Sequence, residues 1–477
     1  MVTGTTTEDA FRQRLRDAVG NRRIILAIIL AGVFLSVLDV QIVAIALPTI
    51  TRLLAAPIGQ TQWIATSYVI TVLATVLIFG TISGSFGNGR LFKAGILIFT
   101  LGSFACGIAG SLPELILFRV IQALGASMLM SICIAIILTV FPPEERGRAM
   151  GFYTAVIAFG MIIGPAAGGF IVDAIGWPFI FFVNVPIGLL LLAASARYLT
   201  FDPGRTRIRL RDPAGAFLLV LLMAALAFAL NTLANPPVQL PALASWTAVF
   251  LAALVLFVAR ERSVPEPFID PAALLERKFC LPAISLILYL TATFVLLTAQ
   301  PFYFEGVMGL RPSHIGLLIL ITPVTMILCA PAFGWVYDRR RWRGYAFTGL
   351  LLMGVAYILC GDAFTGRDFL FIVAMFVLIG IARAVFQGPN SIEIMAALPP
   401  SLQGLGSSVI ISLQYLGIML GISLTTILLT ARLAAAGYAG PVLGADPALL
   451  AGIFGTIMAA GGIICLAGAA FSFRRRG

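Results

Sequence analysis

The chain has 477 residues, of which 60% are hydrophobic and 11% are charged, and its formal net charge is +11. Its mean hydropathy of +1.05 excludes a soluble globular protein, whose surface needs many more polar side chains. The positive charge does not indicate binding to nucleic acid, because the basic residues lie in small groups between apolar runs. The sequence therefore predicts an all-α polytopic protein embedded in a lipid bilayer.

The first segment, residues 1–23, is polar and basic, with Phe11, Leu15 and Val19 recurring every four residues. This spacing favours a short helix on the membrane surface, and a disordered tail is the alternative. The apolar run that follows is too long for the core of a secretion signal. We therefore interpret it as a retained first span after a cytoplasmic N-terminal segment.

Apolar runs between polar, glycine or proline breaks predict fourteen spans. They lie at 24–47, 61–83, 93–110, 113–140, 149–172, 177–199, 213–233, 241–260, 280–304, 313–336, 345–361, 368–398, 405–431 and 448–472. Of the 31 basic residues, 25 fall on one side of these spans, four fall on the other and two lie inside spans. Because cytoplasmic loops carry the excess of Lys and Arg, both termini are expected in the cytoplasm.

Two short loops suggest an internal repeat. The loop from Gly80 to Arg90 and the loop from Gly334 to Arg341 both have glycine at the start and arginine at the end. If they are equivalent, the halves are offset by eight spans, and a six-helix repeat allows this only with two extra spans inserted. We therefore expect six-helix bundles at 24–199 and 280–472, a linker with two additional spans at 200–279, and a cytoplasmic C-terminus at 473–477.

A carboxylate inside the first span, Asp39, is the main candidate for chemistry. An aspartate near the centre of a spanning helix costs roughly 2.5–3.5 kcal/mol, so it is expected to face the protein interior and to have a partner. Arg119 in the fourth span lies at a compatible depth. A pair whose proton occupancy changes during transport is one interpretation, and a permanent ion pair that only fixes packing is the other.

The fifth span carries Gly160, Gly164 and Gly168, one glycine in every four residues, with Pro165 and Gly169 beside them. Such a face permits close approach of another helix, and the proline favours a kink. An interface between the two bundles is one interpretation, and ordinary helix packing is the alternative.

The motifs taken together resemble the fourteen-span drug:proton antiporters of the major facilitator superfamily, over nearly the whole chain. Leu38 and Asp39 through Ala46, Leu47 and Pro48 are similar to the first-helix signature, with Trp63 and Tyr68 opening the second helix. Arg119 to Gln122 resembles the membrane-embedded arginine motif, and Gly160 to Gly169 resembles the antiporter motif. The resemblance implies export of small compounds in exchange for protons by alternating access.

The resemblance also implies cytoplasmic gating loops at Gly80, Gly87, Arg90, Gly334, Asp338 and Arg339. The first of these loops departs from the family pattern, because Gly84 stands where aspartate is usual and Asn88 stands where arginine is usual. Asp338 and Arg339 keep the equivalent pair in the second half. A latch in the second loop alone is therefore expected.

Polar residues inside the spans are candidates for a substrate cavity, although each of them also suits a helix-to-helix hydrogen bond. They are Gln122, Asn184, Gln300, Arg383, Gln387, Asn390 and Gln414. The buried cation Arg383 argues against a multivalent cationic substrate. None of these positions identifies the substrate.

The residues in the spans also bear on other classes of function. The spans contain no spacing typical of an enzyme site, and a single histidine, His314, cannot form a metal cluster by itself. We therefore expect no enzyme activity, no cofactor and no metal. A passive facilitator, an importer of a small metabolite and a sensor that has lost transport remain alternatives on the same fold. The expected location is a bacterial plasma membrane, and whether a periplasmic adaptor protein takes part stays open.

Overall fold

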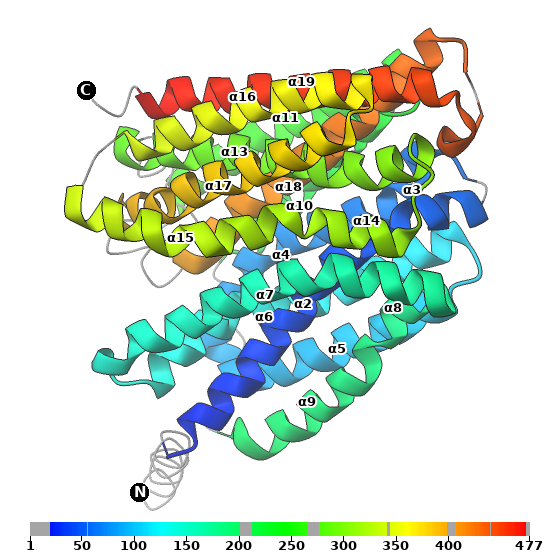
Figure 1. The fold of residues 1–477 in the computed structure, drawn as a ribbon. Coiled ribbons are helices and arrows are strands. Elements are labelled where there is room, and N and C mark those ends of the chain that lie inside the picture. The colour runs from blue at the N-terminus through cyan, green and yellow to red at the C-terminus, as the bar shows by residue number, and fades with distance from the viewer. Residues whose placement is uncertain are drawn as a thin grey trace, which may run out of the picture.

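The computed structural model describes residues 20–54, 56–200, 212–264, 276–340, 344–397, 406–438 and 440–473. The described chain is almost entirely helical, and fourteen of its helical segments are long and apolar enough to cross a membrane. Helices suit this environment because they satisfy every backbone hydrogen bond within one segment. The prediction of an all-α fold with fourteen spans is confirmed (Figure 1).

The first six spans run from α2 to α9. They comprise α2 (Arg22–Leu53), the short α3 (Ile58–Thr61) with α4 (Trp63–Phe86), α5 (Asn88–Ile108), α6 (Leu112–Val140), α7 (Pro143–Ile175), and the short α8 (Phe179–Phe182) with α9 (Asn184–Tyr198). Two more spans follow, α10 (Pro213–Leu233) and α11 (Leu240–Ser263).

The last six spans run from α13 to α19. They comprise α13 (Arg277–Gly306), α14 (Pro312–Ile319) with α15 (Ile321–Arg340), α16 (Tyr345–Gly366), α17 (Phe369–Ala397), α18 (Gly406–Ala435) and α19 (Pro447–Phe473), with a 3₁₀ turn (Val442–Gly444) before α19. We call α2 to α9 the first half and α13 to α19 the second half.

Some predicted boundaries were wrong. The first span was expected to stop at residue 47, but α2 continues through Pro48 to Leu53. A proline removes one backbone hydrogen bond, and membrane helices tolerate that loss inside a packed bundle. The third span starts at Asn88 rather than at residue 93, because only Gly87, with φ 97°, separates α4 from α5.

The two halves lie side by side and meet along a seam (Figure 1). Within the first half α2 packs on α7 and α6, and within the second half α16 packs on α19 and α17. Across the seam α7 contacts α14, α4 contacts α18, and α2 contacts α13. The inserted helix α10 packs on both α4 and α18, so the additional pair lies beside the seam. The exact domain limits at 199–200 and 279–280 stay predictions.

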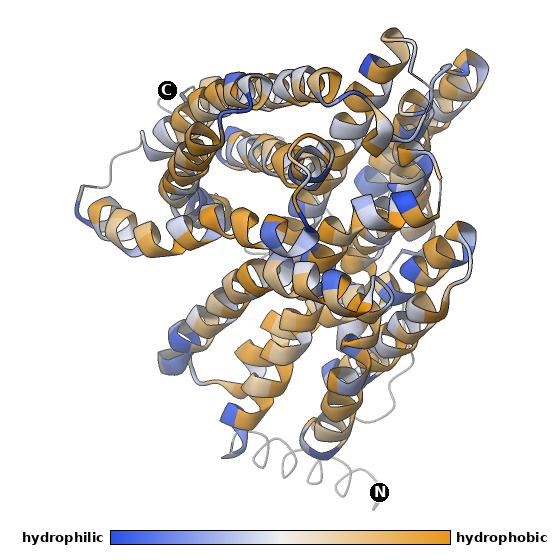
Figure 2. Ribbon diagram, turned by 45° about the vertical axis from the view of Figure 1, so that its right-hand side comes forward, coloured by the Kyte–Doolittle hydropathy of each residue, from blue (hydrophilic) through white to orange (hydrophobic). Residues whose placement is uncertain are grey.

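Both ends of the described chain lie at one end of the bundle, which we call the terminal end; the opposite one is the distal end (Figure 1). The ribbons of α7 and α15 diverge toward the terminal end. Hydrophobic residues cover the lengths of the helices, whereas hydrophilic ones gather near their ends (Figure 2). Large apolar side chains such as Leu328 and Leu370 are 74% and 78% exposed, as expected for a surface that faces lipid.

Candidate functional site

The Asp39 carboxylate lies inside the first half, where four helices bring polar side chains together. Asp39 Oδ2 accepts a hydrogen bond of 2.5 Å from Arg119 Nη1, and the pair forms a salt bridge in which both side chains are 1% exposed. Asp39 Oδ1 accepts from Gln122 Nε2 at 2.7 Å and from Asn184 Nδ2 at 3.2 Å. The helices α2, α6 and α9 thus converge on one carboxylate, with α5 supplying Ser103 behind Gln122 at 2.7 Å.

Arg119 is held in place by contacts beyond the carboxylate. Its Nε donates to the backbone oxygen of Ile64 at 3.0 Å, and its Nη1 also donates to Gln122 Oε1 at 2.6 Å. The guanidinium carbon lies 4.2 Å from the centre of the Tyr68 ring. Arginine suits this place because its planar fork can serve several acceptors while stacking on an aromatic face.

The direction of these hydrogen bonds, from donor to acceptor, indicates whether Asp39 is ionised. An ionised carboxylate is an acceptor only, and Arg119, Gln122 and Asn184 all present N–H donors to Asp39. The arrangement therefore fits an ionised Asp39 paired with Arg119.

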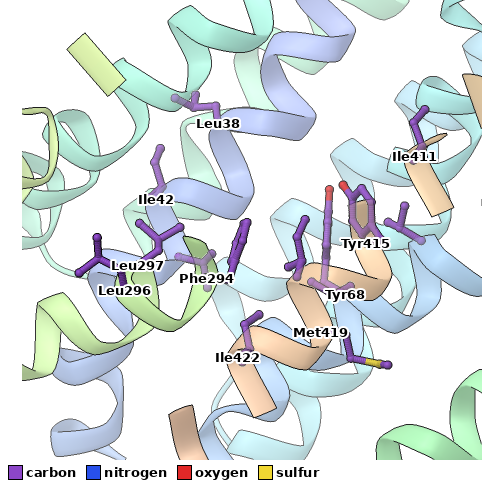
Figure 3. Packing of buried hydrophobic residues seen from close by; sticks show 14 of the residues in the cluster. Leu38, Ile42, Tyr68, Phe294, Leu296, Leu297, Ile411, Tyr415, Met419 and Ile422 are labelled. Atoms are coloured by element: carbon purple, nitrogen blue, oxygen red, sulfur yellow. The ribbon is translucent and has the colours of Figure 1, made fainter. Parts of the chain in front are cut away.

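A pocket beside this network is lined by both halves. The first half contributes residues of α2 and α4 together with Arg119, and the second half contributes residues of α13 and α18. Figure 3 shows Phe294, Leu297 and Ile422 of the second half near Tyr68 of the first. We call this space the arginine-119 pocket; its lining is Val40, Val43, Ala44, Leu47, Ala65, Tyr68, Val69, Arg119, Phe294, Leu297, Thr298 and Ile422. Movement of one half against the other must therefore alter the surroundings of Arg119.

A second pocket also lies between the halves, and Phe294 and Leu297 line both spaces. We call it the arginine-383 pocket, since Arg383 of α17 is its one charged lining residue. Gln41 of α2 and Gln300 of α13 line it as well.

The seven residues predicted for a substrate cavity separate into different places. Gln300 and Arg383 line the second pocket. Gln122 and Asn184 instead bind Asp39. Of the others, Gln387 accepts a hydrogen bond from Tyr289, Asn390 donates to the Pro282 backbone at 3.4 Å, and Gln414 is half-buried outside both pockets.

The glycine motif of α7 has two faces with different neighbours. One face packs on α2. A Cβ added there would meet a residue of α2 in each case: Val37 at Gly160, Gln41 at Gly164 and Ile42 at Gly168. These three glycines thus pack within the first half rather than at the expected interface between halves. The seam is formed by the adjacent face, where Gly169 meets the Pro312 backbone and the Pro165 backbone meets Gly316 of α14.

The two expected gating loops are nearly continuous helix. Gly80 lies inside α4, Gly87 is the break before α5, and Arg90 belongs to α5. Gly334, Asp338 and Arg339 all lie within α15, where the Arg339 guanidinium stacks 4.1 Å from the Trp335 ring. The side chain of Asp338 lies outside the described part of the structure, so the latch in the second loop stays a prediction.

Two polar contacts at the distal end join the halves. Arg52 Nη1 of α2 forms an ion pair of 2.8 Å with Glu305 of α13, whose side chain is 10% exposed. Asp173 of α7 accepts a hydrogen bond of 2.9 Å from the Ser313 backbone of α14. The position of Glu305 near the outer end of its span would suit a solvated side chain, but the halves close around it. Among the described residues no group of His, Cys, Asp and Glu has the arrangement of a metal site.

Known proteins resemble this chain along most of its length. The riboflavin transporter RibZ of Clostridioides difficile (strain 630) is 32% identical over 403 residues, covering 83% of this chain and 86% of that protein. The tetracenomycin C resistance and export protein of Streptomyces glaucescens is 30% identical over 415 residues, covering 84% and 74%. Multidrug resistance protein 3 of Bacillus subtilis (strain 168) is 29% identical over 402 residues, covering 83% and 77%.

Solved structures share the fold. A bacterial homologue of the human lysosomal transporter Spinster, in an inward-facing and unoccupied conformation, superposes with a TM-score of 0.67 at 17% identity, covering 95% of this chain and 96% of that one. The peptide transporter POT in complex with sulfate gives a TM-score of 0.66 at 16% identity, covering 94% of each chain. The sequence model of the Major Facilitator Superfamily matches residues 29–422. The chain therefore belongs to the Major Facilitator Superfamily and is a transporter with a small-molecule substrate.

Proposed function

We propose that this transporter exports small, lipophilic compounds in exchange for protons, by alternating access across a bacterial plasma membrane. The observation that carries the proposal is Asp39, a fully buried carboxylate held by three donors next to a pocket that both halves line. Ionisable groups inside membrane spans commonly mark proton or substrate pathways. The relatives named for drug resistance and for tetracenomycin C export support lipophilic substrates.

The coupling follows from competition between a proton and Arg119 for the same carboxylate oxygen. While Arg119 donates to Asp39 Oδ2, it occupies one of the acceptor positions that a proton would otherwise take. Arg119 also lines a pocket between the halves, so an occupant of that pocket or a movement of the second half can displace it. Displacement exposes an unpaired buried carboxylate, which takes up a proton. By linkage, protonation must then change the affinity for substrate to the same degree.

The orientation of the chain in the membrane determines which state of the transport cycle this conformation would represent. Because 25 of the 31 basic residues are predicted on the side of the termini, we take the terminal end to face the cytoplasm. The Arg52–Glu305 ion pair and the Asp173–Ser313 hydrogen bond then close the outer end. On this proposal the structure corresponds to an inward-facing state, in which Asp39 is ionised after its proton has left toward the cytoplasm.

The test is transport by purified protein in proteoliposomes with an imposed pH gradient. The compound panel contains ethidium, a lipophilic weak acid such as salicylate, tetracenomycin C and riboflavin. We expect at least one compound to move against its concentration gradient when protons flow the other way, and to stop when a protonophore collapses the gradient. Flux of every transported compound at a rate indifferent to the gradient would show a passive facilitator instead.

A second candidate is uptake of a small metabolite, and the relative named as a riboflavin transporter favours it. The fold does not set the direction of transport. The same vesicles separate the two candidates, because import predicts that riboflavin accumulates on the side of the terminal end.

A further inference from the structure

The arginine-383 pocket contains polar groups whose hydrogen-bonding capacity the described residues use only in part. Its walls are mostly apolar and come from both halves; they include Met161, Phe294, Leu296, Leu297, Ile319 and Pro323. Its polar lining comprises Gln41, Thr293, Gln300, Thr322 and Arg383. The two threonine hydroxyls are already satisfied, by the backbone oxygens of Tyr289 at 2.9 Å and of Phe376 at 3.3 Å.

Arg383 is a buried cation without a counter-ion among the described residues. Its side chain is 7% exposed, and Nε donates one hydrogen bond, of 2.9 Å, to the Tyr289 hydroxyl. Its two terminal nitrogens donate to no described residue, and no described carboxylate forms an ion pair with it. A buried charge without a partner is costly, so the arrangement favours a negative group that arrives from outside.

Two amide side chains line the same pocket as Arg383 and also have hydrogen-bonding groups without a described partner. Gln41 is 5% exposed and Gln300 is 2% exposed, and within the described part of the chain neither side chain forms a hydrogen bond. Their amide groups are therefore available to a molecule that enters the pocket. Three largely buried polar side chains with spare hydrogen-bonding capacity around one space favour a binding site over packing alone.

The first half shows how this fold neutralises a buried arginine with a carboxylate of its own. Arg119 lies in the fourth span of the first half and is paired with Asp39 of the first span. Arg383 lies in the fourth span of the second half, and α13, the first span of that half, has a single carboxylate, Glu305, which is paired with Arg52 at the distal end. In the described part of the second half, no carboxylate thus takes the place beside Arg383 that Asp39 has beside Arg119.

We infer that the arginine-383 pocket binds the acidic group of the transported compound, and that the substrate class is amphipathic organic monoanions. Arg383 pairs with a carboxylate or a similar planar anion through its free terminal nitrogens, and Gln41 and Gln300 donate further hydrogen bonds to it. The apolar body of the substrate packs on Phe294 and Leu297. This inference rests on the proposed function, in which a small molecule crosses between the halves.

The site also explains why binding depends on the arrangement of the halves. The free volume of the pocket is about 30 Å³ in this conformation, enough for about two water molecules. A substrate therefore requires the pocket to widen. Because Gln41 belongs to the first half and Arg383 to the second, any relative movement changes the distance across the site.

The test measures binding of three ligands of one shape and different charge to the purified full-length protein, by isothermal titration calorimetry at pH 7. The ligands are 2-naphthoate, 2-naphthamide and 2-naphthyltrimethylammonium. We expect naphthoate to bind about tenfold more tightly than naphthamide, since hydrogen bonds to a charged group contribute about 1.5–3 kcal/mol, and we expect the cation not to bind. Arg383→Gln should abolish the preference, and Arg383→Lys should keep part of it.

The matched control is Arg432→Gln, which removes an exposed positive charge at the end of α18 and should leave all three affinities unchanged. Gln300→Leu is the second variant, since it removes an amide that forms no hydrogen bond within the described chain, so it should fold and weaken naphthoate alone. Equal affinity for naphthoate and naphthamide, no binding of naphthoate to the wild type, or a preference that survives in Arg383→Gln would overturn the inference. Selective binding of naphthoate without gradient-driven transport would refute only the proposed function.

Discussion

At the scale of single residues, the Asp39 network combines groups that the sequence could and could not reveal. A carboxylate and an arginine inside apolar spans are rare enough to be noticed, and their pairing follows from their depth. Ser103, which supports Gln122, gave no such signal, and Tyr68 stood out only as part of the second-helix motif and not as a neighbour of Arg119. A serine or a tyrosine is common in membrane helices, so only the folded structure identifies the ones that touch the network.

A double-mutant cycle tests whether the pair is energetically coupled. Arg119→Gln leaves the buried Asp39 without its cation, and breaking a buried pair costs about 3–5 kcal/mol. We therefore expect a clear fall in the melting temperature of the purified protein. The double variant, Arg119→Gln with Asp39→Asn, should lower the melting temperature by less than the sum of the decreases in the two single variants. Additive losses would mean that the two groups act independently, and Arg367→Gln, at an exposed arginine, serves as the control.

A second residue-scale prediction concerns Asp212, which precedes α10 and is buried. Burial alone would raise the pKa of Asp212, but hydrogen bonds from Arg260 and from the backbone of Gly215 and Ala214 outweigh it and hold the pKa below 3.8. Arg260 Nη2 lies 3.1 Å from Asp212 Oδ1 and joins the end of α11 to the start of α10. A carboxyl whose pKa is lowered on folding stabilises the folded state above its unfolded pKa and loses this effect as pH falls through its folded pKa.

We therefore expect Asp212→Asn to lower the melting temperature at pH 7. The gap to wild type should shrink as the pH falls through the lowered pKa of folded Asp212, because both proteins then carry an uncharged group. Asp362→Asn, at an exposed position of α16, should show no such dependence. A gap of the same size at every pH would exclude an electrostatic role for Asp212.

At the scale of helices, α7 shows how far a glycine pattern can be interpreted. The period of four in Gly160, Gly164 and Gly168 predicted close packing, and α2 is the helix that packs there. The pattern could not say which neighbour it serves, because a smooth face fits any helix. The residues next to it, Pro165 and Gly169, make the contact with α14 of the other half.

A substitution at this seam tests its part in closing the distal end. A Cβ at Gly169 would collide with the Pro312 backbone, whereas a Cβ at Gly151 of the same helix meets nothing within 4 Å. Gly169→Val should separate α7 from α14 and should raise the rate at which a maleimide labels Ser313→Cys in a cysteine-free background. Gly151→Val is the control. Equal labelling rates in the two variants would mean that this contact does not hold the end closed.

At the scale of the whole molecule, the distribution of charge predicts the orientation. The helices α11 and α16 end in exposed residues on opposite sides of the predicted membrane, Ser263 and Arg367. With the terminal end in the cytoplasm, a membrane-impermeant maleimide added to intact cells should label Arg367→Cys and should leave Ser263→Cys unlabelled until the cells are opened. The reverse pattern would invert the chain and the assignment of the inward-facing state.

The architecture was largely predictable from the sequence, whereas the pairing of elements was not. All fourteen spans follow from apolar runs, since only a continuous helix satisfies its backbone in lipid. The helix ends near Pro48 and Asn88 differ from the predicted ones. Packing within the bundle supports helical backbone at residues where proline or polar residues would be expected to end a span. The Arg52–Glu305 ion pair joins residues 253 positions apart, a distance at which no local pattern carries information.

The central claim is that protonation of Asp39 drives transport, and one measurement tests it most directly. Purified wild type, Asp39→Asn and the control Asp362→Asn are reconstituted, and each is assayed for uptake driven by a pH gradient and for substrate exchange without one. Asparagine cannot carry the exchanged proton, so we expect Asp39→Asn to lose gradient-driven uptake while it keeps exchange, and Asp362→Asn to keep both. Full gradient-driven uptake by Asp39→Asn would contradict the account and would leave Asp39 as a residue that only fixes packing.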